Sequence, residues 1–435
     1  MPTAKTTAAG PTTPAAGTAP RPATSAATGT AGAATSATGR RLGWLLALAV
    51  AVAALNLRPV VTSLGPMLKE VRADLHMGGA VAGLLGAVPS LCFAAFGLAA
   101  PALARRFGPV LVVTAGLGAI ALGVLSRSFA GGTAVFLLLS AVALAGVAVA
   151  NVLIPVVIKR YFPDRVGPMI GLYSMALSVG TAAAAALTVP MTKAFDTTWR
   201  VGLGIWGLLA VAGLGLWLVT LLLRRDTRPA AAAETAASAP AAKLPITRSR
   251  TAWALGAFFG LQATSAYATM AWLPTIYRDA GVSESASGVL LALVMAISVP
   301  ASFILPNLAA RRGEQGLFVV VLALCGIAGF TGLALAAGTL PWLWATLVGL
   351  SMCAFPLALT MIGLRARTPG GVTQLSAFAQ SLGYLISIPG PILVGTIYQS
   401  TGEWYLPLGF LALLLLPQMV FGIRAGKARH VEDEG

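Results

Sequence analysis

Charged residues, cysteine and histidine are all scarce in this sequence. Only 10% of the 435 residues are charged, and the chain has three cysteines and two histidines. The cysteines stand singly in apolar runs, and His76 and His430 lie outside those runs. Disulfides, zinc sites and His-based catalytic dyads need such residues in close sets, so we expect no disulfide, metal site, cofactor or enzyme activity.

Apolar residues make up 57% of the chain, and they come with 49 Gly and 27 Pro. The mean hydropathy is +0.85. A water-soluble core does not need this many apolar positions. Helices in a bilayer tolerate Gly and Pro because neighbouring helices satisfy the freed backbone groups. The composition therefore predicts an all-α membrane protein.

Twelve apolar segments are long enough to cross a bilayer, which takes about 17 to 25 residues. We expect these spans at residues 43–67, 79–103, 109–127, 132–157, 167–191, 201–223, 252–275, 286–309, 317–337, 340–362, 373–397 and 405–423. The polar linker 224–250 separates a bundle at 43–223 from a bundle at 251–423. Residues 1–42 are mostly Ala, Thr, Pro, Gly and Ser and are expected to be a disordered tail, and 424–435 form a second tail.

The two bundles repeat the same landmarks in the same order. Pro66, Gly83 and Arg105-Arg106 of the first bundle correspond to Pro274, Gly288 and Arg311-Arg312 of the second, and Gly180 corresponds to Gly383. Parallel repeats of this kind predict two pseudo-symmetric six-helix bundles, the major facilitator arrangement. In that arrangement the substrate binds between the halves near the midplane of the membrane.

The basic residues are distributed unevenly between the two ends of these spans. With both termini on one side, 22 of the 29 basic residues fall on that side and six, including Arg127, fall on the other. The positive-inside rule then places both tails and the linker in the cytoplasm, in a multi-pass protein of the inner (plasma) membrane. The net charge of +16 reflects this topology, with membrane lipids as partners, so we expect no nucleic-acid partner.

One basic residue, Arg58, lies in the interior of a predicted span, about 25 Å from its cytoplasmic end. No Asp or Glu falls within any of the twelve predicted spans. A cation at this depth costs about 2.5–3.5 kcal/mol on insertion scales, and such residues usually face a cavity. We therefore expect Arg58 to be the counter-charge for an anionic substrate. The alternative is that it snorkels outward or bonds backbone carbonyls freed by Pro59.

Further polar side chains are expected at the same depth as Arg58. Some lie beside the backbone opened by Pro59, and others lie at the aligned positions of the second bundle. A third group forms a polar stripe at helical spacing. The predicted substrate-binding residues are Arg58, Asn56, Asn151, Tyr173, Gln262, Tyr267, Gln380 and Tyr384. Hydrogen bonds between helices are the open alternative for several of them. Helix packing is favoured for Ser174 and Ser178.

Three stretches carry a family resemblance: NLRPVVTSLGPML from Asn56 to Leu68, GLQATSAYATMAWLPTI from Gly260 to Ile276, and GPILVGTIYQSTGEW from Gly390 to Trp404. They resemble the cyanate permease and 2-nitroimidazole transporter family of the major facilitator superfamily. The resemblance spans the whole membrane region. It implies a transporter of that fold but singles out no substrate.

Together these features predict a secondary active transporter for a small organic or inorganic anion or weak acid, cyanate-like or carboxylate-like. It would work by alternating access, with Arg58 as the counter-charge. The alternative is an exporter of neutral or aromatic compounds, such as nitroimidazole-like drugs, in which Arg58 is structural. We expect a monomer. No carboxylate relay lies in the predicted spans, so the direction of transport and its coupling to protons stay open.

Overall fold

The computed structural model describes residues 29–224 and 245–434, and every regular element in these ranges is a helix. The first half contains α1 (Gly29–Asn56), α2 (Pro59–Thr62), η1 (Gly65–Met67), α3 (Leu68–Asp74), α4 (Gly79–Phe107), α5 (Pro109–Arg127), α6 (Thr133–Tyr161), η2 (Pro163–Arg165), α7 (Val166–Ala194) and α8 (Trp199–Arg224). The second half contains η4 (Ile246–Arg248), α9 (Arg250–Asp279), α10 (Glu284–Ala310), α11 (Gly316–Ala336), α12 (Pro341–Met352), α13 (Ala354–Leu364), α14 (Pro369–Ser387), α15 (Pro389–Thr401), α16 (Tyr405–Ala425) and η5 (Val431–Asp433).

Eleven segments of the described chain are long and apolar enough to cross a membrane, and α9 is a further helix of 30 residues. Polar residues such as Gln262, Thr264 and Thr269 lower the hydropathy of α9, and all three are buried. A helix surrounded by protein does not need an apolar surface, because its polar groups face other helices instead of lipid. The predicted all-α fold of twelve crossings is confirmed.

The first crossing is interrupted next to Pro59. Helix α1 ends at Asn56, and α2 begins at Pro59, with Leu57 and Arg58 in a turn between them. Proline lacks a backbone N–H and its ring clashes with the preceding turn, so the helix cannot continue through it. The opening of the backbone beside Pro59 that the sequence predicts is present, and it leaves Arg58 at the N-terminus of a new helix.

Residues 29–42 differ from the sequence prediction. They are helical and form the start of α1, whereas a disordered tail was expected to reach residue 42. Residues 29–42 continue the apolar helix that follows them, and extending an existing helix avoids the cost of forming a first turn. The remainder of the predicted tail, residues 1–28, and most of the predicted linker, residues 225–244, lie outside the described residues.

The residues after α16 are packed against the second half. Val431 is buried, and its N–H donates a hydrogen bond to the carbonyl of Arg365. The Glu434 carboxylate accepts hydrogen bonds from the backbone N–H of Thr251 and from the hydroxyl of Ser249, at the first turn of α9. A carboxylate at this position satisfies a free N–H and complements the helix dipole. The predicted second tail thus caps a membrane helix.

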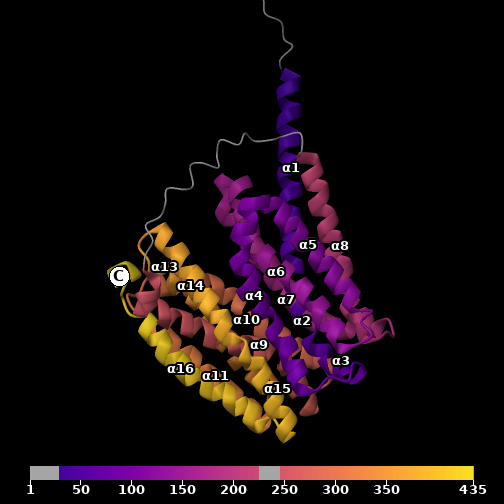
Figure 1. The fold of residues 1–435 in the computed structure, drawn as a ribbon, viewed down its shortest axis with the longest axis vertical. Helices are drawn as coiled ribbons and strands as arrows, with labels where there is room; N and C mark the ends of the chain where they lie inside the picture. Colours follow the sequence, from indigo (N-terminus) through magenta and orange to yellow (C-terminus); the bar gives the residue numbers. More distant parts are fainter. Residues whose placement is uncertain (1–28, 225–244, 435) are drawn as a thin grey trace, which may run out of the picture. The chain divides into compact units, whose positions relative to one another are not determined.

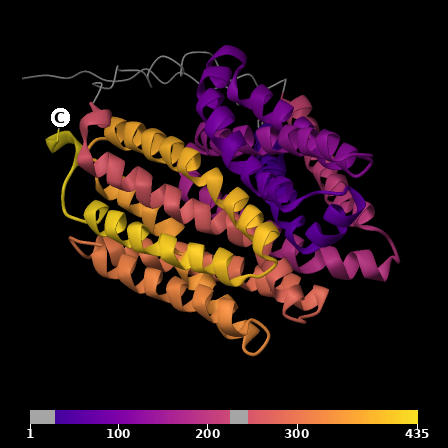
Figure 2. The same cartoon turned by 60° about the horizontal axis from the view of Figure 1, so that its bottom comes forward.

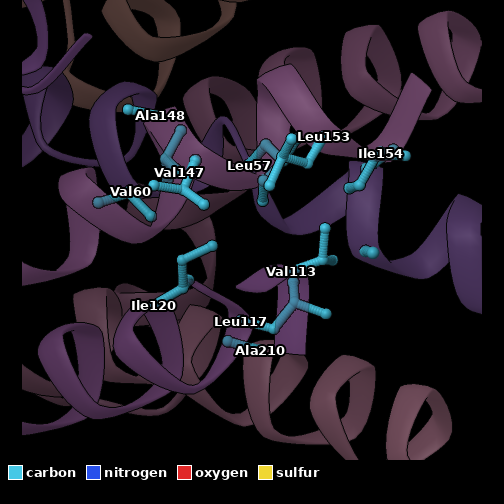
Figure 3. Close-up of a cluster of buried hydrophobic side chains, with 14 of the residues drawn as sticks. Leu57, Val60, Val113, Leu117, Ile120, Val147, Ala148, Leu153, Ile154 and Ala210 are labelled. Atoms are coloured by element: carbon cyan, nitrogen blue, oxygen red, sulfur yellow. The ribbon is translucent and has the colours of Figure 1, made fainter. Parts of the chain in front are cut away.

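Within the part of the chain from Trp44 onward, the two halves form separate groups of helices. The indigo-to-magenta helices lie on one side and the orange-to-yellow helices on the other (Figures 1 and 2). Between the groups, α7 packs against α10, and α4 packs against α14 and α15. The first half has its own apolar core, where Leu57 and Val60 meet Val113, Val147 and Leu153 (Figure 3).

Equivalent glycines of the sequence repeat make equivalent contacts. Gly180 of α7 packs directly on the backbone of Leu55 in α1, and Gly383 of α14 packs on Phe259 in α9. Each is thus a close contact between the fifth crossing of one half and the first crossing of the same half. Glycine permits such backbone approach because it has no Cβ. The pseudo-symmetry predicted from the order of Pro and Gly is visible in these contacts.

Candidate functional site

A cavity of about 480 Å³ lies between the two halves. Its wall is formed by α7, α9, α10, the α12–α13 segment and α14, together with Arg58. The polar residues of the wall are Arg58, Ser174, Ser178, Thr181, Gln262, Tyr267, Ser298, Ser302, Thr360 and Tyr384. No Asp, Glu, His or Lys is among the residues that line it. The wall can bind by hydrogen bonds, by apolar contact and by one positive charge, and it holds no group for carboxylate- or imidazole-based acid–base chemistry.

Arg58 supplies that charge. The break at Pro59 places it at the N-cap of α2, where it is half-buried and borders the cavity. Tyr267 lies close enough in the cavity wall for the positive charge of Arg58 to act on its hydroxyl. Among residues 29–224 and 245–434, no carboxylate lies within ion-pair distance of it. A guanidinium has five N–H donors, so Arg58 can bind a further partner.

Three more of the predicted residues border the cavity. Gln262 and Tyr267 project from α9, and Tyr384 projects from α14. The Oε1 atom of Gln262 is buried and accepts no hydrogen bond from the described residues. The Tyr384 ring is stacked on Phe93, with ring centroids 5.1 Å apart. Buried polar atoms are usually hydrogen-bonded, so the free oxygen of Gln262 is a candidate ligand atom.

The other four predicted residues do not line the cavity. Asn56 is buried, and its Nδ2 donates to the carbonyls of Val52 and Leu209, at 2.8 and 3.2 Å. The hydroxyl of Tyr173 donates to Oδ1 of Asn151, at 2.7 Å. These contacts correspond to the alternative of hydrogen bonding between helices.

The fourth of these residues is Gln380. Its Nε2 donates to the hydroxyl of Ser376 on the same helix, at 2.6 Å. The eight residues were predicted from their depth in the membrane and their helical spacing. The rotation of each helix about its axis decides which of these side chains reach the cavity.

The sequence interpretation favoured packing for Ser174 and Ser178, but both border the cavity. It missed Ser298 and Ser302 on α10, whose spacing of four residues was a usable signal for one polar helix face. It also missed the apolar part of the wall, including Phe259, Phe355 and Met295. Among so many apolar residues, no sequence signal separates those that face a cavity from those that face lipid.

At one end of the molecule, ion pairs join the two halves. Lys69 is paired with Asp279, and Arg278 is 2.6 Å from Glu70. Arg278 is also 2.7 Å from Glu284, which in turn is paired with Lys193 at 2.8 Å. We call this the ion-pair end. Within the described ranges, every salt bridge that links the two halves lies here.

Two glycines bring the helices of the two halves into direct contact near this end. A Cβ on Gly83 of α4 would lie 2.5 Å from the carbonyl oxygen of Pro391 in α15. A Cβ on Gly288 of α10 would lie 2.5 Å from the carbonyl oxygen of Ala185 in α7. These two glycines are the aligned positions of the repeat. The halves are therefore closed against each other at the ion-pair end by symmetry-related contacts.

Asp279 is the most extensively bonded carboxylate of the ion-pair end. It is paired with Lys69, and its Oδ2 accepts hydrogen bonds from Trp404 and Tyr398. Burial by itself raises the pKa of Asp279, but the hydrogen bonds and the positive charge of Lys69 outweigh burial, and the pKa lies below its ordinary value. Asp279 is therefore ionised at neutral pH.

Arg127 occupies a position that the sequence did not predict. It was counted with the residues outside the membrane, but its side chain is only 1% exposed. Its Nη1 donates to the carbonyl of Val60, at 3.0 Å, and its guanidinium lies 5.9 Å from the centroid of the Phe136 ring. A terminal arginine can fold back against its own bundle, and the break in the first crossing offers it an accepting carbonyl.

Curated proteins similar in sequence include three bacterial transporters. An uncharacterized transporter, YycB of Bacillus subtilis (strain 168), is 35% identical over 89% of this chain and 94% of its own length. The 2-nitroimidazole transporter of Escherichia coli (strain K12) is 32% identical over 91% of this chain and 99% of its own. The cyanate transport protein CynX of the same strain is 31% identical over 86% of this chain and 95% of its own. The resemblance identified from three sequence stretches is confirmed.

The comparison of folds agrees. A crystal structure of the nucleoside transporter NupG (D323A mutant) aligns with a TM-score of 0.72 at 13% identity, over 88% of this chain and all of that one. Residues 45–391 match the Major Facilitator Superfamily. The chain is therefore a multi-pass membrane transporter that belongs to the Major Facilitator Superfamily.

Proposed function

We propose that this transporter moves a small organic anion or weak acid, with Arg58 as the counter-charge. The proposal rests on the position of Arg58, which borders the cavity between the halves. Within residues 29–224 and 245–434, no carboxylate forms an ion pair with it. An unpaired cation among membrane helices is costly, and the cost falls when a ligand brings the opposite charge. A planar guanidinium also binds carboxylates and similar anions through two parallel hydrogen bonds.

The size and lining of the cavity support an organic anion in preference to a very small inorganic one. A volume of about 480 Å³ is in the usual range for sites that bind drug-sized molecules, and it far exceeds a three-atom ion. Phe259, Phe355 and Met295 provide apolar contact for the body of a substrate. Arg58 and the free Oε1 of Gln262 would then bind its polar groups.

A second candidate is export of neutral aromatic compounds, and one observation favours it. Arg58 lies near the polar hydroxyl of Tyr267, which can stabilise part of its charge without a ligand. The aromatic wall of Phe259, Phe355 and Tyr384 would suit a stacked ring. One of the similar proteins is named a 2-nitroimidazole transporter, and another a cyanate transport protein. The two candidates differ in whether binding requires the charge of Arg58.

The arrangement of the halves supports alternating access as the mechanism. The halves are joined at the ion-pair end, whereas the cavity wall extends toward the opposite end, to Ser302 of α10 and Thr360 of α13. Under the positive-inside rule the ion-pair end would face away from the cytoplasm. We infer that this conformation offers the cavity to the cytoplasm. Rocking one half against the other would break the ion pairs and open the cavity to the other side.

The test is binding and transport by Arg58→Gln and Arg58→Lys in purified, reconstituted protein. A panel of organic anions and neutral analogues would first be screened by thermal shift, because a ligand that binds only the folded state raises the unfolding midpoint. Loss of a hydrogen bond to a charged group costs about 1.5–3 kcal/mol, so Arg58→Gln is expected to weaken anion binding roughly 10- to 100-fold. Arg58→Lys keeps the charge but not the planar fork and is expected to recover binding only in part.

The matched control is Arg311→Gln, which removes one positive charge from an exposed position outside the cavity. Its anion affinity should equal that of the parent. If Arg58→Gln folds and binds anions as tightly as the parent, the counter-charge role is wrong. Export of neutral aromatic compounds becomes the better proposal if the parent binds no anion and Arg58→Gln binds neutral aromatic compounds as tightly as the parent.

A further inference from the structure

The guanidinium of Arg127 has N–H groups that nothing in the described chain accepts. Nη1 donates to the carbonyl of Val60, while Nε and Nη2 are buried without a hydrogen-bond partner in residues 29–224 and 245–434. No carboxylate of these ranges lies within ion-pair distance of Arg127. The carboxylate of Asp74 is paired with Arg200 at 2.7 Å. Arg127 is thus a second cation of the bundle without a counter-charge.

A small cavity of about 20 Å³ adjoins this guanidinium. Apolar side chains of α2, α4, α6 and α9 form most of its wall, and Arg127, Ser140 and Tyr267 are the residues of the wall with polar side chains. The hydroxyl oxygen of Ser140 is also buried and without a partner among the described atoms. A volume of about 10–15 Å³ by this measure holds one water-sized group. The cavity therefore has room for a single small ion, and two of the residues that line it carry three buried polar atoms without partners among the described residues.

Charge decides which kind of group belongs there. Arginine keeps its proton in proteins, so burial cannot be relieved by deprotonation. A water molecule could accept hydrogen bonds from the guanidinium but would leave its positive charge uncompensated in a poorly polarisable environment. A monoanion satisfies the N–H groups of Arg127, accepts from the hydroxyl of Ser140 and cancels the charge. We propose that Arg127 and Ser140 form a binding site for a monatomic anion of the size of chloride, separate from the central cavity.

The location of this site relates it to the central cavity. Tyr267 borders both cavities, and Arg58 lines the central one with it. The small cavity also borders Leu68 and Ala271, which lie toward the ion-pair end from Arg58 and Tyr267 along α3 and α9. The anion site thus lies between the central cavity and the ion-pair end. Binding at Arg127 and Ser140 requires no substrate at Arg58. The proposed anion site is therefore independent of whether the protein transports anions.

The experiment uses bromide as the probe, on the purified full chain in a chloride-free gluconate buffer of constant ionic strength. Bromide is expected to raise the unfolding midpoint in a saturable way, because it binds the folded state only. Gluconate is too large for this small cavity, so it does not compete with bromide there. Arg127→Gln is expected to raise the apparent Kd for bromide at least tenfold, and Ser140→Ala by a smaller factor. Arg58→Gln should leave it unchanged, which separates this site from the proposed substrate site.

A control variant and a crystallographic measurement complete the test. Ser90→Ala removes a buried hydroxyl that is bonded to Ser387 outside this cavity, and it should not change the bromide response. Crystals grown with bromide should show an anomalous peak within hydrogen-bond distance of Nε or Nη2 of Arg127 and Oγ of Ser140. If Arg127→Gln does not fold, this peak and Ser140→Ala decide the question. A parent without a bromide-dependent midpoint, or with water in place of the peak, overturns the proposal.

Discussion

Gly83→Ala tests whether the close contact between α4 and α15 holds the ion-pair end shut. The added Cβ would lie 2.5 Å from the carbonyl oxygen of Pro391 and 2.7 Å from Cα of Ile392, and both are backbone atoms that cannot rotate away. Ordinary contact begins at 3.4 Å, so the two helices would have to separate by about 0.9 Å at this point. The conformation in which the halves part at this end would not have the clash.

The size of the effect follows from the cost of overpacking. An extra methyl group in a packed interior costs about 1–3 kcal/mol. If that cost falls only on the closed conformation, the ratio of the two conformations shifts by about 5- to 150-fold toward the one open at the ion-pair end. Gly288→Ala should act in the same direction, because its Cβ would lie 2.5 Å from the carbonyl oxygen of Ala185.

The assay is the reactivity of one cysteine placed in the central cavity, Ala266→Cys, after Cys92, Cys325 and Cys353 have been replaced by alanine. An impermeant maleimide is added from the side that the ion-pair end faces. The labelling rate should be low in the parent background. In Gly83→Ala it should rise by about 5- to 150-fold. Gly97→Ala is the matched control, since Gly97 lies on the same helix with no atom within 4 Å of its added Cβ.

The reasoning is refuted if Gly83→Ala folds, with an unchanged elution profile, and labels no faster than Gly97→Ala. It is also refuted if both substitutions raise the rate equally, because the effect would then come from the alanine and not from the contact. Equal behaviour of Gly83→Ala and Gly288→Ala would support the symmetry of the two contacts.

Two further predictions concern groups away from the cavity. Asn56→Ala removes hydrogen bonds to the carbonyls of Val52 and Leu209 and should lower the free energy of unfolding by about 1–3 kcal/mol without changing substrate affinity; a loss of affinity at unchanged stability would return Asn56 to the binding site. Because the pKa of Asp279 is lowered, its pairing with Lys69 is complete above the pKa of an unfolded aspartate and is lost as the pH falls through the lower folded value. The fraction of molecules open at the ion-pair end should therefore be constant from pH 5 to 8 and rise only below about pH 4, and Asp279→Asn should remove that rise. It is measured by the distance between two spin labels, one on each half at this end, because maleimide labelling itself slows as the thiol is protonated.

Composition and spacing were sufficient for the architecture. Long apolar segments can satisfy their backbone in a bilayer only as helices, so the crossings follow from length and hydropathy. The order of Pro66, Gly83 and Gly180 against Pro274, Gly288 and Gly383 indicated two like bundles, and the glycines of this series make equivalent contacts. A scarce residue was equally informative: with so few charges in the predicted spans, Arg58 could be picked out before its surroundings were known.

The tertiary structure decided which polar residues face the cavity and which bind other helices. Asn56 and Gln262 both belonged to the polar layer expected from the sequence, yet one bonds a neighbouring helix and the other lines the cavity. The burial of Arg127 was likewise invisible in the sequence, where it ends a span like any residue at the membrane edge. The depth of a residue along a membrane helix can be read from the pattern of apolar residues in the sequence. The rotation of that helix against its neighbours depends on how many side chains pack together, and only the folded chain settles it.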